Sequence, residues 1–176
     1  DVYKRQALIL SGGPASVTGK GGPKAPEKLF KLGIPILGIC YGQQTMCEQL
    51  GGRTETAEKR EFGRAQIEIV ESCDIFTEIW EPGQRADVWM SHGDRIESLN
   101  ERFEVLSPTH SSPFSADRHL EPHIYGFQIH PELTHQTQRR YPRALEITAQ
   151  WPVDLALRPR FKPQLNGTIT ILLHIL

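Results

Sequence analysis

Cysteine is scarce in this chain. Its 176 residues include three cysteines, and no two of them have the CxxC spacing of a zinc site. An odd set of that kind argues against a disulfide-stapled secreted protein and against a structural metal centre. We therefore expect a reducing, cytoplasmic location and no bound metal.

Long apolar runs and an excess of one charge are also missing. The longest apolar run, ITILLHIL at residues 169–176, is far too short to span a bilayer. Lysine and arginine number 20 and the acidic residues 21, for a net charge of −1, so nothing favours nucleic acid or an anionic membrane as a partner. The length and the apolar fraction of 38% fit one globular domain with a substantial core.

The first third of the chain alternates two kinds of pattern. Residues 7–10 and 35–39 are short apolar runs, typical of buried strands. Residues 23–33 and 41–52 have helical spacing, and each ends in glycine, which favours a left-handed cap. This order predicts a parallel sheet covered by helices.

The rest of the chain is less regular. Four segments read as short strands of antiparallel or mixed type that extend the first sheet: 65–71, 87–94, 102–107 and 124–130. The charged segment 58–64 is expected to be a solvated loop. Beyond residue 138, prolines at 142, 152, 159 and 163 exclude a long helix, so no regular structure is expected there.

The segment GICYG places Cys40 between a predicted strand and a predicted helix. A thiolate attacks carbonyl carbons, and a helix N-terminus lowers the ordinary cysteine pKa of about 8.5. Gly38 and Gly42 would permit the tight turn, as in the nucleophile elbow of GxSxG hydrolases. The main-chain N–H of Tyr41 would then face an oxyanion. A buried, inert cysteine fits the same segment.

Three further motifs could complete such a site. The segment QIHPE contains His130, a possible base, and Glu132, which could orient it. A non-catalytic histidine beside a surface carboxylate would fit the same segment. LSGGP could aim main-chain N–H groups at a developing negative charge, and SHGD could bind a ligand through its backbone and Asp94. Each is also compatible with a plain loop. His92 could compete as the base, but no carboxylate lies beside it in the HxE arrangement.

Taken in order, LSGGP, GICYGQQ, REFGRA, SHGD and HPE resemble the class I glutamine amidotransferases, most closely the amidotransferase domain of GMP synthases. The resemblance covers residues 7–138 and leaves 1–6 and 139–176 as a leader and a tail unlike the family. It implies an α/β, flavodoxin-like fold. In this fold a mixed, mainly parallel sheet is flanked by helices, and here the first βα unit is missing.

The resemblance also implies a reaction and its residues. The family hydrolyses glutamine, and the ammonia would serve the amination of xanthosine monophosphate to GMP. The implied residues are the triad Cys40, His130 and Glu132, the oxyanion hole Gly13 and Tyr41, and the glutamine-binding residues Gly12, Gln44, Ser91, His92, Gly93 and Asp94.

The chain has no P-loop motif, so no cofactor is expected in this domain. ATP and magnesium are expected only in a partner synthetase, fused or separate. Another class I amidotransferase, a γ-glutamyl peptidase and a non-catalytic fragment stay open as alternatives.

Overall fold

The computed structural model describes residues 8–77, 79–120 and 123–130, and the architecture below is that of these residues. The predicted leader and tail lie outside them. Five strands form the main sheet in the order β1-β2-β7-β6-β5. Their bounds are Leu8–Leu10 (β1), Ile36–Ile39 (β2), Ile124–Phe127 (β7), Ala116–His119 (β6) and Phe103–Ser107 (β5).

The main sheet is mixed. Strands β1, β2 and β7 are parallel neighbours, whereas β6 runs antiparallel to β7 and β5 antiparallel to β6. The predicted α/β fold with a mixed sheet is therefore confirmed. The parallel half of the sheet contains the strands predicted at 7–10 and 35–39.

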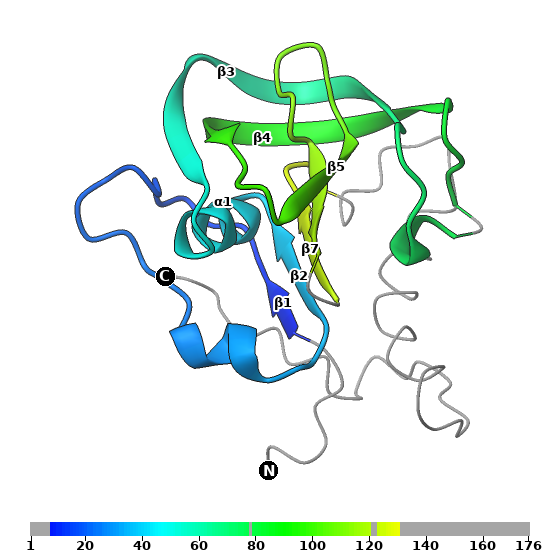
Figure 1. Cartoon of the computed structure of the whole chain (residues 1–176). Coiled ribbons are helices and arrows are strands. Elements are labelled where there is room, and N and C mark those ends of the chain that lie inside the picture. Colours follow the sequence, from blue (N-terminus) through cyan, green and yellow to red (C-terminus); the bar gives the residue numbers. More distant parts are fainter. Residues whose placement is uncertain (1–7, 78, 121–122, 131–176) are drawn as a thin grey trace, which may run out of the picture.

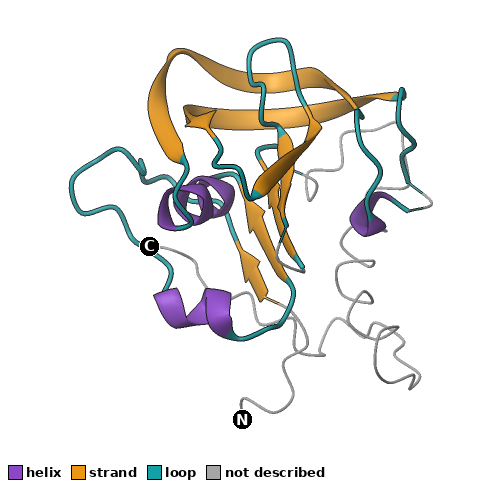
Figure 2. Ribbon diagram, viewed as in Figure 1, coloured by secondary structure: helices purple, strands orange, loops and turns teal. Residues whose placement is uncertain are grey.

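Two long strands make a separate sheet, which corrects the sequence prediction. β3 (Arg53–Glu68) and β4 (Arg85–Ser98) pair antiparallel with each other rather than extending the main sheet. The segment 58–64, predicted to be a loop, lies within β3. We call this pair the β3–β4 ribbon. Figures 1 and 2 show it lying across one end of the main sheet.

The helix α1 (Tyr41–Gln49) confirms the second predicted helix, and Gly51 at φ 94° ends it in the left-handed region. The first predicted helix is wrong in extent. It contracts to a 3₁₀ turn, η2 (Glu27–Lys31), because Pro26 disfavours helical backbone in the residue before it and few residues remain before Gly33. A second 3₁₀ turn, η3, spans Asp74–Phe76.

The two faces of the main sheet are covered differently. On one face, Leu10, Ile36 and Ile124 pack with Met46 of α1 and with η2. On the other face, side chains of β2 and β7 pack against the ribbon, including Ile67 and Met90. Helix α1 contacts both ribbon strands as well as the main sheet. The site described next lies at that junction.

Candidate active site

Cys40 occupies a strained turn between β2 and α1. It is the N-cap of α1, with φ 51° and ψ −109°. Its N–H donates to the Phe127 carbonyl of β7 at 2.7 Å, and its own carbonyl accepts from the Gln44 N–H at 3.0 Å. A non-glycine residue in such a conformation costs on the order of 1–3 kcal/mol and persists only where its surroundings fix it. The turn therefore holds the thiol in a set direction at a helix N-terminus.

The flanking glycines are required by close backbone approach. A Cβ on Gly42 would lie 1.9 Å from the Leu10 carbonyl oxygen of β1. A Cβ on Gly38 would lie 2.7 Å from the Gln43 backbone nitrogen. No side chain fits at either position unless the backbone moves. The turn thus needs small neighbours, as expected from GICYG.

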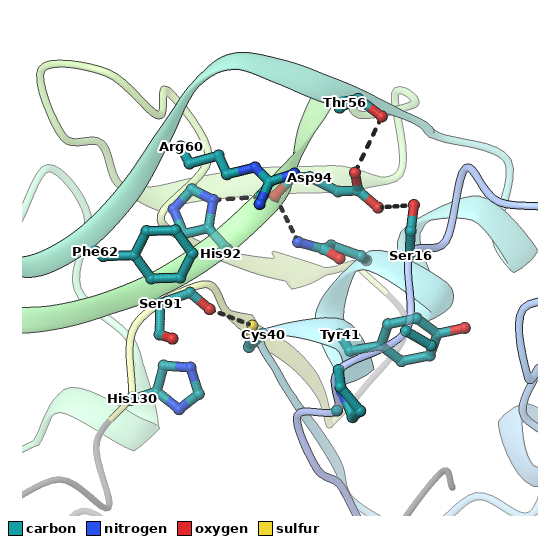
Figure 3. A pocket seen from close by; sticks show the side chains of 15 residues that line it. Ser16, Cys40, Tyr41, Thr56, Arg60, Phe62, Ser91, His92, Asp94 and His130 are labelled. Atoms are coloured by element: carbon teal, nitrogen blue, oxygen red, sulfur yellow. Dashed lines mark hydrogen bonds between the residues drawn. The ribbon is translucent and has the colours of Figure 1, made fainter.

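The thiol opens on a cavity of about 530 Å³ at the carboxyl ends of the parallel strands (Figure 3). Gly13, Cys40 and His130 follow β1, β2 and β7, and this edge of an open α/β sheet is where ligands commonly bind. The lining residues are Gly13, Pro14, Ala15, Ser16, Cys40, Tyr41, Gln44, Thr56, Arg60, Phe62, Ser91, His92, Gly93, Asp94 and His130.

Most of the residues predicted from sequence are brought together here. Gly12 is not in the lining, but a Cβ placed on it would lie 3.5 Å from Cys40 Cβ and 3.4 Å from His130 Cε1. Cys40 and His130 therefore flank the same glycine. Glu132 lies outside the described residues, so its place in a triad stays a prediction.

The β4 strand forms the wall beside the thiol. The Cys40 thiol donates to the Ser91 carbonyl at 3.5 Å, and the His130 N–H donates to the Trp89 carbonyl at 3.0 Å. Figure 3 shows the His130 ring next to the Cys40–Ser91 contact. The Tyr41 hydroxyl donates to the Pro23 carbonyl at 2.8 Å, so near Cys40 this residue contributes its main chain.

Asp94 forms structural hydrogen bonds that were not predicted from the sequence. Its carboxylate accepts hydrogen bonds from Ser16 Oγ at 2.5 Å, the Val17 N–H at 3.0 Å and Thr56 Oγ1 at 3.1 Å. The loop after β1 is thereby tied to both ribbon strands. Its predicted part in glutamine binding remains a prediction.

The other two cysteines are buried away from the cavity. Burial raises the pKa of both Cys47 and Cys73 to about 12, so these thiols stay neutral at physiological pH. Among the three cysteines, Cys40 alone lines the cavity. Cys40 is therefore the cysteine placed to act as a nucleophile in the cavity.

Sequence reasoning missed several residues that build the site. Ser16, Thr56, Arg60 and Phe62 line the cavity, and Glu61 contacts His92 with Oε2 2.9 Å from Nε2. His92 has no carboxylate in an HxE arrangement, as the sequence indicated, but Glu61 of the opposite strand supplies one. Reading residues 58–64 as a strand instead of a loop would have been the signal.

Neither a metal centre nor a membrane span occurs in the part of the chain described. No group of three or more histidine, cysteine, aspartate or glutamate side chains is arranged to hold a metal ion there. Nor does any helix in that part have the length and apolar character needed to cross a membrane.

Comparisons with family models and with curated proteins indicate the same family. The family model glutamine amidotransferase class-I matches residues 2–148. The GMP synthase [glutamine-hydrolyzing] of Marinobacter nauticus is 50% identical over 141 residues, which cover 77% of this chain and 27% of that protein. The Rhizobium etli protein of the same name is 48% identical over 130 residues, covering 74% and 25%. The chain thus spans about a quarter of the length of these relatives.

Solved structures agree. A Thermoplasma acidophilum protein assigned as one subunit of a GMP synthase superposes with a TM-score of 0.66 and 27% identity, over 85% of this chain and 73% of that one. A glutamine amidotransferase from Thermotoga maritima gives 0.65 with 22% identity, over 86% and 64%, and supports the fold alone. On its sequence and its fold together, the chain belongs to the class I glutamine amidotransferases, a family of enzymes.

Proposed function

We propose that this chain hydrolyses glutamine at Cys40 and that the ammonia serves the amination of xanthosine monophosphate to GMP in the cytoplasm. The observation that carries the proposal is the position of Cys40. Its thiol sits on a strained turn at the N-terminus of α1 and faces a cavity that His130 also lines. A structural cysteine would need neither the strain nor the opening.

The reaction follows from these groups. His130 removes the thiol proton, and Cys40 Sγ attacks the carboxamide carbon of glutamine. The main-chain N–H groups of Gly13 and Tyr41 stabilise the oxyanion. The C–N bond then breaks, His130 gives its proton to the leaving nitrogen, and ammonia departs from a glutamyl thioester. Glu132 is proposed to hold the imidazole tautomer.

The second half of the reaction restores the thiol. His130 accepts a proton from water, the hydroxide adds to the thioester carbon, and the C–S bond breaks to release glutamate. The proton held by His130 returns to Sγ. Atoms balance as glutamine plus water giving glutamate plus ammonia.

The polar groups beside the thiol are proposed to hold the substrate. Ser91, His92, Gly93 and Asp94 present successive groups of β4 to the cavity, and Gln44 adds an amide from α1. Gly12 is proposed to let the substrate approach the backbone between Cys40 and His130.

A synthetase is the proposed consumer of the ammonia. Relatives named GMP synthase are about four times longer than the stretch matched here, so the acceptor chemistry would lie in their remaining length. ATP and magnesium would act in that synthetase, and no cofactor is proposed for this domain.

Glutamate release from the 176-residue chain tests the proposal. It would be measured with and without a GMP-type synthetase, ATP, magnesium and xanthosine monophosphate, with Cys40→Ala as the blank. We expect slow release by the chain alone and faster release once the synthetase and its nucleotides are added. Equal release with and without them would favour another amidotransferase or a γ-glutamyl peptidase. Release no greater than that of the blank would favour a non-catalytic fragment.

A further inference from the structure

An irregularity in the β3–β4 ribbon shapes the roof of the cavity. Thr56 pairs with Asp94, but the next pair is Glu61 with His92, so residues 57–60 stand against Gly93 alone. Bulges of this kind bend a strand and redirect its side chains. The result is that Arg60 and Phe62 reach the cavity while Glu61 lies directly across from His92.

Glu61 and His92 form a close, largely buried pair. The His92 side chain is 2% exposed and that of Glu61 16%, with 2.9 Å between Nε2 and Oε2. On its other side, His92 Nδ1 lies 3.0 Å from the Asp94 carbonyl oxygen. A carbonyl can only accept, so Nδ1 must carry a hydrogen. In a neutral imidazole Nε2 is then an acceptor facing a second acceptor, and the contact calls for one more proton between the two.

The Asp94 carbonyl connects this pair to Gln44. Gln44 Nε2 donates to that carbonyl at 2.7 Å and to Gln128 Oε1 at 3.1 Å. Both hydrogens of the amide are therefore used, which fixes which end of the amide is the donor. Gln44 also lines the cavity, so its Oε1 is the atom left to accept from a ligand N–H.

We propose that Glu61 is a positioning residue for glutamine binding. It shares one proton with His92, and His92 in turn fixes the Asp94 carbonyl that orients the Gln44 amide. The ligand group recognised at Gln44 is an N–H donor, which glutamine has at both its amide and its α-ammonium ends. This inference rests on the proposed glutaminase function.

Other charged and titratable groups from four elements line the same cavity as His92. Arg60 comes from β3, Asp94 from β4, Cys40 from the start of α1 and His130 from the segment after β7. Burial lowers the pKa of His92, the Glu61 carboxylate opposes that shift, and His130 adds to it. The shared proton is therefore lost as the pH rises, and glutamine binding should weaken with it.

Two substitutions of Glu61 distinguish the effect of the shared proton from the effect of the Glu61–His92 contact itself. Glu61→Ala removes the partner, whereas Glu61→Gln supplies an N–H that can donate to a neutral His92 Nε2 without any extra proton. The matched controls are Glu68→Ala and Glu68→Gln, on the same strand, where the carboxylate forms an exposed ion pair with Arg85 at 3.4 Å. Steady-state glutamate release would be measured across a range of pH.

For Glu61→Ala we expect KM for glutamine to rise about tenfold with kcat changed less than about threefold, the scale of one lost charged hydrogen bond. Glu61→Gln should keep a KM near that of the wild type but lose the rise of KM with increasing pH. The Glu68 variants should match the wild type. Wild-type KM and pH dependence in Glu61→Ala would overturn the proposal, as would equal loss in both Glu61 variants at all pH values.

A second readout does not depend on catalysis. The imidazole ¹⁵N signals of His92 should show a protonated or proton-sharing Nε2 in the wild type and an unprotonated Nε2 in Glu61→Ala at the same pH. An unprotonated Nε2 in the wild type at every pH where the chain is folded would overturn the shared proton. If the wild type released no glutamate, the proposed function would fail. The spectrum would still show whether Glu61 and His92 share a proton.

Discussion

At the scale of single residues, the three cysteines should differ sharply in reactivity. The thiol of Cys40 lines the cavity, whereas burial holds the pKa of Cys47 and Cys73 at about 12 and keeps both as neutral thiols. Because the thiolate is the reactive form, iodoacetamide should modify Cys40 first at neutral pH. Peptide mapping over a time course checks this. Faster modification of Cys47 or Cys73 in the folded chain would show that the turn does not activate its thiol.

Asp117 gives a second prediction, this one for stability. It is fully buried on β6, where the Gln43 amide donates to its Oδ2, and burial raises its pKa from 3.8 to about 7. The folded chain thus holds this proton more tightly than the unfolded chain. Its stabilising effect is complete below pH 3.8 and disappears as the pH rises through about 7.

Asp117→Asn should remove that dependence while keeping an acceptor for Gln43. We expect the variant to be more stable than the wild type above neutral pH, by on the order of 3 kcal/mol, and similar to it in acid. Urea unfolding at several pH values measures the difference. Asp87→Asn, at a half-exposed ion pair with Arg64, is the control and should change stability by less than about 1 kcal/mol. Parallel stability curves for Asp117→Asn and the wild type would contradict the assignment.

At the scale of elements, the contact of α1 with β1 depends on Gly42. A methyl group there would meet the Leu10 carbonyl oxygen at 1.9 Å, and neither backbone can move without disturbing the sheet or the turn at Cys40. Gly42→Ala should therefore lower the free energy of unfolding by about 3 kcal/mol or more. Gly93→Ala is the comparison for stability, because its Cβ would meet only the flexible Arg60 side chain at 3.6 Å. Thermal unfolding of both variants would measure the difference, and similar losses would refute the close-approach argument.

Sequence predicted some elements better than others for a physical reason. β1, β2 and α1 are set by local signals, namely apolar runs, helical spacing and glycines at the turns. The ribbon was missed because alternation of side chains such as Ile67 and Glu68 identifies a strand but not its partner. The first predicted helix failed because prolines left too few residues to nucleate it.

At the scale of the whole molecule, the order of motifs along the chain identified the site. The structure added the contacts between residues that lie far apart in sequence. The resemblance gave Gly13, Cys40 and His130 their roles, and the structure brings them together because each follows a strand and these strands share one carboxyl edge. Glu61 was not predicted from sequence because its contact with His92 depends on a bulged register between strands far apart in sequence. The ties between Asp94 and the loop after β1 have the same long-range origin.

The central claim is that Cys40 attacks the carboxamide carbon of glutamine. It is tested most directly by labelling the chain with a glutamine analogue that carries a chloromethyl ketone in place of the amide. Intact mass and peptide mapping should show one addition, on Cys40, that excess glutamine prevents, that excess asparagine does not prevent, and that is absent in Cys40→Ala. Addition at another residue, or labelling of Cys40 that glutamine fails to prevent, would contradict the account.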